Sequence, residues 1–291
     1  MAGKNGVLVT GVTGKQGGAV AGALLRDGIR VVGLTRNVSG AAAWADRGVE
    51  LAGGDLRDRD SLARALETVD RAYLVTTPFE AGMEAEVDMG VAFVDAAKEA
   101  GVGQLVFSSV VSADAATGIP HFETKGRIEE RLKKSGVPFT ILRPAFFMDN
   151  FLAPWILPGI RAGKVTLGVR ADRKLQMVAV RDIGEFALEA FRRPKRFLGR
   201  TIELAGDDLT IPAALAVISR VTSHPIRYEA VPDGRLEKAF GDDMARMYRW
   251  FNDVGYSVDI EGLRIDWEVP LTTFREFAAG TPWSDWEVKA A

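Results

Sequence analysis

The fold is decided by one stretch near the start of the chain, Val7-Leu8-Val9-Thr10-Gly11-Val12-Thr13-Gly14-Lys15-Gln16-Gly17. Its apolar beginning, residues 7–9, predicts a buried strand, and residues 19–25 beyond it predict a helix with an apolar face. Three glycines with the spacing G-x-x-G-x-x-G stand between the two elements. A strand, a glycine turn and a helix in this order form the phosphate-binding corner of dinucleotide-binding folds.

Each glycine of this corner has a physical reason to be there. Gly11 permits a tight turn, Gly14 lets backbone N–H groups approach a pyrophosphate, and Gly17 lets the helix pack closely on the strand. The start of the helix then offers unpaired N–H groups and a partial positive charge to the phosphates. The alternative is a glycine-rich turn that binds no ligand.

Strands and helices alternate regularly through residues 1–144. This rhythm predicts an α/β fold of the Rossmann type, a doubly wound parallel sheet with helices on both faces. We expect strands at residues 30–35, 50–52, 71–75, 104–107 and 139–142. We expect helices at residues 41–47, 60–66, 84–100 and 123–135, with Ser61 as a possible cap of the second.

After Pro144 the rhythm changes, and residues 145–291 predict a smaller α+β substrate lobe. Residues 174–180 read as a strand, 182–191 as a helix, and 236–254 as one long helix. We place the division between a nucleotide-binding domain, 1–144, and this lobe at Pro144, and we expect the two to exchange elements.

Ligands of a doubly wound sheet bind at the carboxyl ends of its strands. This rule and the glycine corner together select the residues expected to contact a dinucleotide: Gly11, Thr13, Gly14, Lys15, Gln16, Gly17, Arg36, Asp55, Leu56, Thr76, Thr77, Pro78, Lys125, Pro144 and Phe147.

The residue after the second strand indicates which dinucleotide binds. NAD-binding folds usually place a carboxylate there to hold the ribose 2′-hydroxyl, whereas this chain has Arg36. A guanidinium suits a 2′-phosphate, and Lys15 could add a second cation, so the sequence favours NADP(H). The alternatives are that Arg36 is a solvated surface residue and that Asp55 is an ordinary turn carboxylate.

Candidate catalytic residues lie at the start of the helix expected after the fifth strand. His121 and Lys125 are four residues apart and therefore share a helix face, so both could meet one ligand. Lys125 could bond the nicotinamide ribose, and His121 could donate a proton near neutral pH. The alternatives are a solvated imidazole at a helix entry and an ordinary surface lysine.

An aromatic cluster follows the sixth strand and suggests an apolar substrate pocket. The residues expected to line the pocket are Phe79, Phe122, Phe146, Met148, Phe151 and Trp155. Packing within the core is the alternative, because large apolar side chains are most often buried for packing alone.

Composition excludes several classes of function. The 291 residues include no cysteine, which excludes disulfides and thiolate chemistry, and no histidines or carboxylates recur at metal-ligand spacing. A formal net charge of −2 gives no electrostatic case for nucleic acid or an anionic membrane. Residues 1–6 carry no apolar signal core, and no apolar run approaches a membrane span, so we expect a cytoplasmic protein. The oligomeric state stays open.

Together these motifs resemble the NmrA-like family, an atypical branch of the short-chain dehydrogenase/reductases. The resemblance rests on the glycine corner, Thr35-Arg36, Gly54-Asp55-Leu56, the 121–126 block, and Leu142-Arg143-Pro144 with the residues to Asn150. It implies NADP(H) at the glycine turn, with Arg36 near the 2′-phosphate and Lys125 near the nicotinamide ribose. The absence of a tyrosine four residues before Lys125 departs from the wider superfamily and argues against ordinary alcohol dehydrogenation. It is compatible with direct hydride transfer to a conjugated acceptor, and the resemblance implies acceptors such as a quinone, a dye or an aromatic natural product. A non-catalytic regulator that senses NADP(H) and acts through a protein partner is the alternative.

Overall fold

The computed structural model describes residues 5–283, which divide into two compact units. Unit 1 consists of the residues up to Pro144 together with Val180–Glu203. Unit 2 consists of Ala145–Ala179 and the residues from Leu204 onward. The sequence assigned Val180–Glu203 to the second lobe, but this segment belongs to unit 1 because its helix and strand complete the large sheet of that unit.

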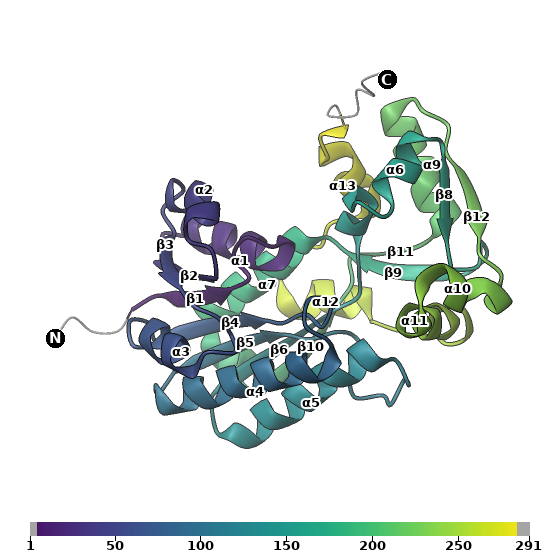
Figure 1. Cartoon of the computed structure of the whole chain (residues 1–291). Helices are drawn as coiled ribbons and strands as arrows, with labels where there is room; N and C mark the ends of the chain where they lie inside the picture. The colour runs from purple at the N-terminus through teal and green to yellow at the C-terminus, as the bar shows by residue number, and fades with distance from the viewer. Residues whose placement is uncertain (1–4, 284–291) are drawn as a thin grey trace. The chain divides into compact units, whose positions relative to one another are not determined.

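A seven-stranded sheet forms the centre of unit 1, with the strand order β10-β6-β5-β4-β1-β2-β3 (Figure 1). The strands from β1 to β6 are joined by parallel pairings, which is the predicted Rossmann-type arrangement. Strands β2 and β3 lie on one side of β1, and β4, β5 and β6 lie on the other side. A ligand crevice is therefore expected between β1 and β4, at their carboxyl ends. The bounds are β1 Val7–Thr10, β2 Val31–Thr35, β3 Glu50–Gly53, β4 Arg71–Val75, β5 Gln104–Ser108, β6 Phe139–Pro144 and β10 Arg200–Leu204.

Helices cover both faces of this sheet. The helices α3, α4 and α5 pack side by side on one face, and α1 packs with α7 on the other (Figure 1). α1 and α7 approach closely, since a β-carbon on Gly184 would lie 2.7 Å from the carbonyl oxygen of Ala19. The bounds are α1 Lys15–Arg26, η1 Ser39–Ala41, α2 Ala42–Ala45, α3 Arg59–Leu66, α4 Met83–Glu99, α5 Pro120–Ser135, α7 Val180–Arg192 and α8 Pro194–Phe197.

The predicted elements of unit 1 are all present, with ends that differ by up to four residues. The helix cap expected at Ser61 is wrong. Asp58 caps α3 by accepting a hydrogen bond from the backbone N–H of Asp60, and the Ser61 hydroxyl donates to backbone carbonyls instead. Asp is as good a cap as Ser, and it stands immediately before the first helical residue.

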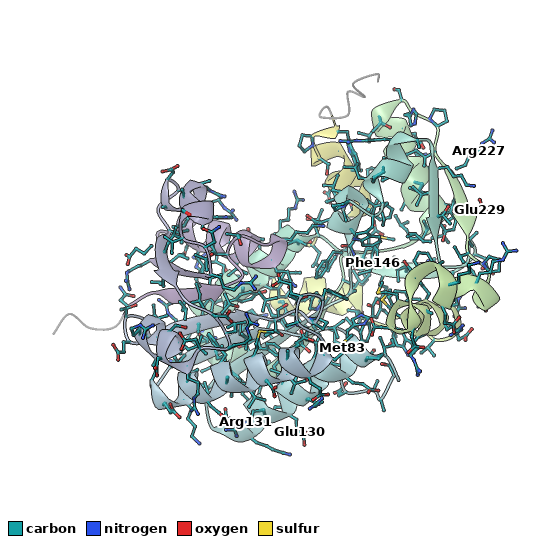
Figure 2. All side chains as sticks on the ribbon, in the orientation of Figure 1. Met83, Glu130, Arg131, Phe146, Arg227 and Glu229 are labelled. Atoms are coloured by element: carbon teal, nitrogen blue, oxygen red, sulfur yellow. The ribbon has the colours of Figure 1, made fainter. Side chains whose placement is uncertain are left out.

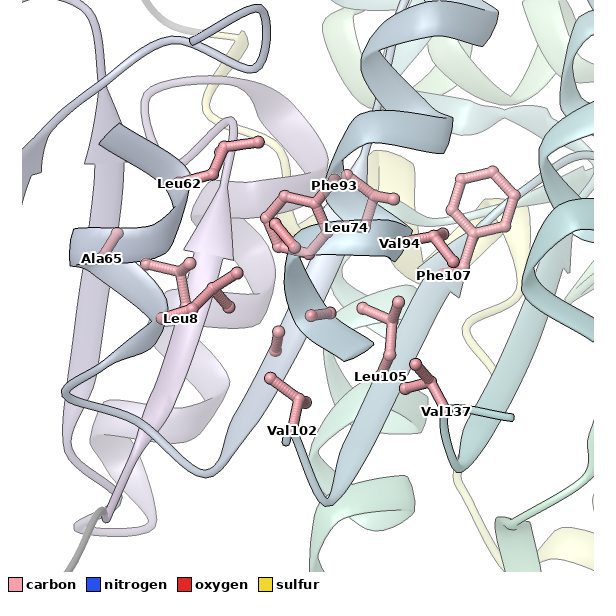
Figure 3. Close-up of a cluster of buried hydrophobic side chains, with 14 of the residues drawn as sticks. Leu8, Leu62, Ala65, Leu74, Phe93, Val94, Val102, Leu105, Phe107 and Val137 are labelled. Carbon is pink, nitrogen blue, oxygen red and sulfur yellow. The ribbon is translucent and has the colours of Figure 1, made fainter. Parts of the chain in front are cut away.

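Apolar side chains fill the space between the sheet and α3, α4 and α5 (Figure 3). Leu8, Leu74 and Phe107 point from the strands toward Phe93 and Val94 on α4, and all five are fully buried. The outer side of the same layer is polar: Glu130 and Arg131 point away from the sheet (Figure 2). α4 and α5 are therefore amphipathic helices whose apolar sides fix the sheet edge that carries the candidate site.

Unit 2 contains two small sheets, β11-β9-β7 and β12-β8, with several short helices. On β12, Arg227 and Glu229 both project into solvent, as strand alternation requires (Figure 2). Its elements are β7 Phe146–Phe147, η2 Met148–Leu152, α6 Leu157–Arg161, β8 Lys164–Leu167, β9 Lys174–Val178, β11 Asp207–Thr210, α9 Ile211–Thr222, β12 Arg227–Ala230, η3 Asp233–Arg235, α10 Leu236–Phe240, α11 Asp242–Asp253, α12 Ile260–Trp267 and α13 Phe274–Gly280.

The single long helix predicted for residues 236–254 is wrong. It is two helices, α10 and α11, divided at Gly241, whose φ is +80°. A residue with positive φ interrupts the right-handed helix, and glycine adopts this conformation without steric cost. Within the described residues no helix is long and apolar enough to span a membrane.

Two helix-interior glycines should respond oppositely to the same substitution. A β-carbon on Gly90 of α4 would lie 2.5–2.9 Å from three atoms of the buried Ile128, whereas one on Gly22 of α1 would lie 3.4 Å from the flexible end of Arg47. We expect Gly90→Ala to lower the free energy of unfolding by about 1–3 kcal/mol through overpacking. Gly22→Ala should raise it by about 0.5–1 kcal/mol because alanine favours the helix.

Urea unfolding of the two variants and the parent chain measures both effects. A stabilising Gly90→Ala would contradict the close packing of α4 against α5.

Candidate functional site

The glycine corner has the geometry that its spacing predicts. Gly11 has a φ of +61°, and its carbonyl oxygen accepts a hydrogen bond from the N–H of Gly14 at 2.8 Å. A β-carbon on Gly17 would lie 2.2 Å from that same oxygen, which is far inside van der Waals contact. Only glycine fits at position 17, so the close approach of α1 to the turn depends on it.

Helix α1 begins at Lys15 with no side chain capping it. Gly14 stands at the N-cap, it makes no side-chain cap hydrogen bond, and the first turn contains no acidic residue. The start of α1 thus presents the positive end of the helix dipole, with no carboxylate of its own first turn beside it, which suits an external anion. With the glycine cradle, these features fit the diphosphate of a dinucleotide.

A depression of about 320 Å³ runs along the outer flank of α1. Gly14, Gly18 and Gly22 form its floor, and the guanidinium of Arg47 stacks 4.0 Å from the Trp44 ring beside it. Its charged lining is mostly basic and consists of Lys15, Arg26, Arg47, Arg181 and Glu185. Arg26, at the far end of α1, pairs with Glu185, so Lys15, Arg47 and Arg181 give the depression its net positive charge.

The Gln16 side chain contacts the ends of β4 and β5. Its side-chain oxygen accepts a hydrogen bond of 2.6 Å from the Ser108 hydroxyl, at the carboxyl end of β5, and a longer one from Tyr73. Burial raises the pKa of Tyr73, which keeps this phenol protonated as a donor. Gln16 therefore ties the glycine corner to the ends of β4 and β5.

Arg36 lies at the carboxyl end of β2, and its side chain is 59% exposed. Its guanidinium donates to the Glu80 carboxylate, with 2.7 Å between Nη2 and Oε2. Nearby, the Asp55 carboxylate accepts two hydrogen bonds from the Arg57 side chain, at 3.1 and 2.8 Å. The Arg57 bonds, with a smaller contribution from Arg36, lower the pKa of Asp55 from 3.8 to about 2. Leu56 packs against the core beneath these charges.

Lys125 is buried in a polar cluster between β4, α4 and α5. Its ammonium donates to the Thr76 carbonyl oxygen at 2.6 Å and to the Thr76 hydroxyl at 3.0 Å, and it lies 2.8 Å from Glu86 Oε1. Glu86 is fully buried and also accepts a hydrogen bond from the Thr124 hydroxyl. These contacts involve all three N–H donors of the ammonium, so a ribose hydroxyl would bind Lys125 by replacing one of the Thr76 contacts.

The charge of Lys125 depends on two opposing effects. Burial lowers the pKa of Lys125, and the Glu86 carboxylate opposes that decrease. A buried ammonium and a buried carboxylate each need the other, because either charge alone in the interior costs several kcal/mol. Glu86 therefore fixes both the position and the charge of Lys125.

His121 sits in the first turn of α5, one helical turn before Lys125. Its ring packs edge-on against Phe122, with centroids 4.8 Å apart, and lies 6.0 Å from the ring of Phe79. Phe79 is 71% exposed and belongs to the turn after β4, in which the Thr77 hydroxyl accepts a hydrogen bond from the Phe79 N–H. Unit 1 thus brings His121, Phe79 and the Lys125 cluster to the end of β4.

The other residues expected at the site lie elsewhere or have other contacts. Met148 and Phe151 are fully buried within unit 2, where Phe151 packs against Phe146 and Phe274, an arrangement that fits the core-packing alternative. Trp155 is 54% exposed in the same unit. Phe147 is also in unit 2, whereas Pro144 ends β6 in unit 1. The roles of these residues toward a ligand remain predictions, and so do the roles of the exposed Thr13 and the buried Pro78.

Sequence reasoning missed three charged residues of the site: Arg57, Glu80 and Glu86. Arg57 follows Asp55-Leu56 directly, and Glu80 stands in the turn after β4, so both were near positions already selected. Glu86 carried a detectable signal, because it precedes Gly90 and Val94 at helical spacing on the buried side of α4. A carboxylate on an apolar helix face indicates a buried partner. Within residues 5–283 no group of histidines and carboxylates could hold a metal ion.

Comparisons with known proteins show similarity along most of the chain. The sequence model of the NmrA-like family matches residues 3–278. The chain is 30% identical over 231 residues to the NAD(P)H azoreductase of Xenophilus azovorans, covering 77% of each chain. It is 34% identical over 227 residues to the (4-alkanoyl-5-oxo-2,5-dihydrofuran-3-yl)methyl phosphate reductase of Streptomyces griseus subsp. griseus, covering 77% of this chain and 76% of that one.

Among solved structures, the triphenylmethane reductase of Citrobacter sp., complexed with NADP(H), has a similar fold. The TM-score is 0.80 at 20% identity, with 94% of this chain and 98% of the other covered.

The buried pair of Lys125 and Glu86 should be strongly coupled. We expect Glu86→Gln to lower the free energy of unfolding by about 3–5 kcal/mol, because it leaves Lys125 without its counter-ion in the interior. The double variant with Glu86→Leu and Lys125→Met should lose less free energy of unfolding than the single variant Glu86→Leu or the single variant Lys125→Met. In the double variant neither charge is left unpaired. Denaturant unfolding of the singles and the double gives the coupling energy.

Glu130→Gln is the matched control, because Glu130 pairs with Lys134 on the exposed side of α5. It should change stability by under about 0.5 kcal/mol. Additive effects of the two buried substitutions would refute the pairing.

The depressed pKa of Asp55 should be visible by NMR titration of its carboxyl carbon. We expect a midpoint near 2 in the parent chain and a return toward 3.8 in Arg57→Gln. Because the folded pKa is the lower one, the stabilisation from this pair is present above about pH 4 and is lost as the pH falls toward 2. Arg127→Gln, which removes the partner of Glu84, should leave the Asp55 midpoint unchanged. An unchanged midpoint in Arg57→Gln would refute the pair.

Proposed function

Because the chain belongs to the NmrA-like family, we propose that it is an NADPH-dependent reductase that transfers hydride to a flat conjugated or aromatic small molecule, such as a quinone or a dye. The observation that carries the proposal is the uncapped glycine corner of α1, with an arginine instead of a carboxylate at the end of β2. Such a corner binds a dinucleotide diphosphate, and the arginine suits its 2′-phosphate.

In this proposal each group of unit 1 has one task. The amides at the start of α1 bind the diphosphate, and Arg36 binds the 2′-phosphate beside Asp55. Lys125, held by Glu86, orients the nicotinamide ribose near Thr76. Bound NADPH supplies the hydride, and the protein contributes orientation and exclusion of water.

The proton that completes the reduction has two sources in the proposal, His121 and water. His121 stands four residues before Lys125 and beside the exposed Phe79, at the position where a flat acceptor would stack. An acceptor with an extended π system stabilises the negative charge that hydride addition produces. Protonation can then follow hydride transfer, which makes a dedicated proton donor such as tyrosine dispensable.

Two curated relatives support this acceptor class. One is named for azo compounds and the other for an oxo-dihydrofuran phosphate, and both names denote reductases of unsaturated groups. We infer a related class of acceptor for this chain, with the individual substrate to be identified by assay.

The test is incubation of the purified chain with NADPH and, one at a time, a panel of quinones, azo dyes and triphenylmethane dyes. Turnover is measured as the loss of NADPH absorbance with each acceptor. We expect turnover on at least one acceptor. Tight binding of NADPH with no turnover on any of them would favour a regulator that senses the coenzyme.

Arg36→Glu should distinguish the two coenzymes. We expect it to weaken NADPH binding by at least about tenfold and NADH binding much less, because it removes the cation facing the 2′-phosphate and adds a like charge. Fluorescence titration with each coenzyme measures the difference. Equal losses for NADPH and NADH would show that Arg36 does not contact the phosphate.

A further inference from the structure

We propose that Glu80 is a built-in competitor of the coenzyme 2′-phosphate, which limits the preference of this site for NADPH over NADH. The proposal rests on the proposed function, since it concerns the same coenzyme site. It begins from the ion pair that joins Arg36 after β2 to Glu80 in the turn after β4, two positions 44 residues apart in the chain.

The pair occupies the place where the phosphate would have to bind. The Glu80 carboxylate lies 2.7 Å from the Arg36 guanidinium, the distance at which a phosphate oxygen would stand. A carboxylate and a phosphate both bind a guanidinium through its N–H donors, so Glu80 takes one donor, that of Nη2, which the phosphate would use.

The surrounding charges strengthen the competition. Asp55 engages the neighbouring Arg57 through two hydrogen bonds, so two arginines are balanced by two carboxylates at this edge of the sheet. The hydrogen bonds to Asp55 raise the pKa of the Arg57 guanidinium, and Glu80 makes a smaller contribution. A 2′-phosphate brings a charge of about −1.5 to −2, and Glu80 must move away before it can bind without repulsion.

NADH does not face this competition. Its ribose 2′-hydroxyl is neutral and can donate a hydrogen bond to a carboxylate, as it does in NAD-binding folds. Glu80 in its present position is thus compatible with NADH and unfavourable to NADPH. Since Glu80 is 58% exposed, rotation of its side chain into solvent is sufficient to release Arg36.

The turn that carries Glu80 also carries Phe79. The Pro78 carbonyl accepts a hydrogen bond from the Gly82 N–H at 2.7 Å, which closes the turn, and the ring of Phe79 lies 6.0 Å from that of His121. The turn therefore keeps its own backbone hydrogen bond when the Glu80 side chain releases Arg36.

The experiment is isothermal titration of the full chain with NADPH and with NADH, for the parent and for Glu80→Gln. Glutamine keeps the shape of the side chain and removes its charge. We expect Glu80→Gln to tighten NADPH binding about three- to fivefold, the size that an exposed ion pair allows. NADH binding should stay the same or weaken, because the hydroxyl loses an ionised acceptor.

Glu99→Gln is the matched control. Glu99 forms a single exposed contact of 2.9 Å with Arg59, so the substitution removes the same charge and a similar pair, but at the opposite end of α4. It should change neither affinity. In an Arg36→Gln background the NADPH gain from Glu80→Gln should disappear, because the competition acts through Arg36.

Equal tightening of both coenzymes, or the same gain from Glu99→Gln, would overturn the competitor role in favour of a general charge effect. An unchanged NADPH affinity in a folded Glu80→Gln variant would overturn it as well. In each of these results the parent chain still binds NADPH. If the proposed function is wrong, the parent chain itself binds no NADPH, so the two cases can be distinguished.

Discussion

The close contact between Gly17 and the carbonyl oxygen of Gly11 is the constraint on which the candidate site depends. A side chain at position 17 would collide with that oxygen, so the absence of a β-carbon brings the start of α1 against the end of β1. At the same place, no side chain caps the start of α1. The close strand–helix packing and the positive pole that suits a diphosphate therefore meet at one corner of the chain.

The edge of the sheet is held together by buried charges as well as apolar packing. Arg143, at the end of β6, pairs with the buried Glu129 and with Asp114 in the loop after β5. Glu86 on α4 and Lys125 on α5 form a second buried pair. Such pairs are costly to bury, and they do not explain stability by themselves. Their consequence is geometric, because each charge has one position in which it is satisfied.

The coenzyme edge shows the opposite arrangement, with charges that are exposed and exchangeable. Arg36, Arg57, Asp55 and Glu80 neutralise one another in water, where each pair contributes little to folding. A site of this kind can exchange an internal carboxylate for an external phosphate at small cost. Buried pairs therefore hold the catalytic candidates in place, while exposed pairs remain free to respond to the ligand.

The sequence alone determined the nucleotide-binding half of the chain. Strand and helix periodicity, interrupted by glycines, gave every element of the parallel sheet, since these signals are local and one face or both faces of each element are buried. The G-x-x-G-x-x-G spacing located the glycine corner, because the backbone conformation it requires excludes other residues. Arg36 could be placed at the end of β2 from its position after an apolar run.

Tertiary structure decided what no local signal contains. The return of Val180–Glu203 to unit 1 depends on packing against α1 and the sheet, and the sequence shows only a helix and a strand. The break between α10 and α11 depends on the positive φ of Gly241, a backbone angle that the sequence does not show. The partners of Lys125 and Arg36, Glu86 and Glu80, lie 39 and 44 residues away in the chain. A charge can be recognised in a sequence, but its counter-ion is chosen by the fold, because Coulomb attraction depends on distance in space and not along the chain.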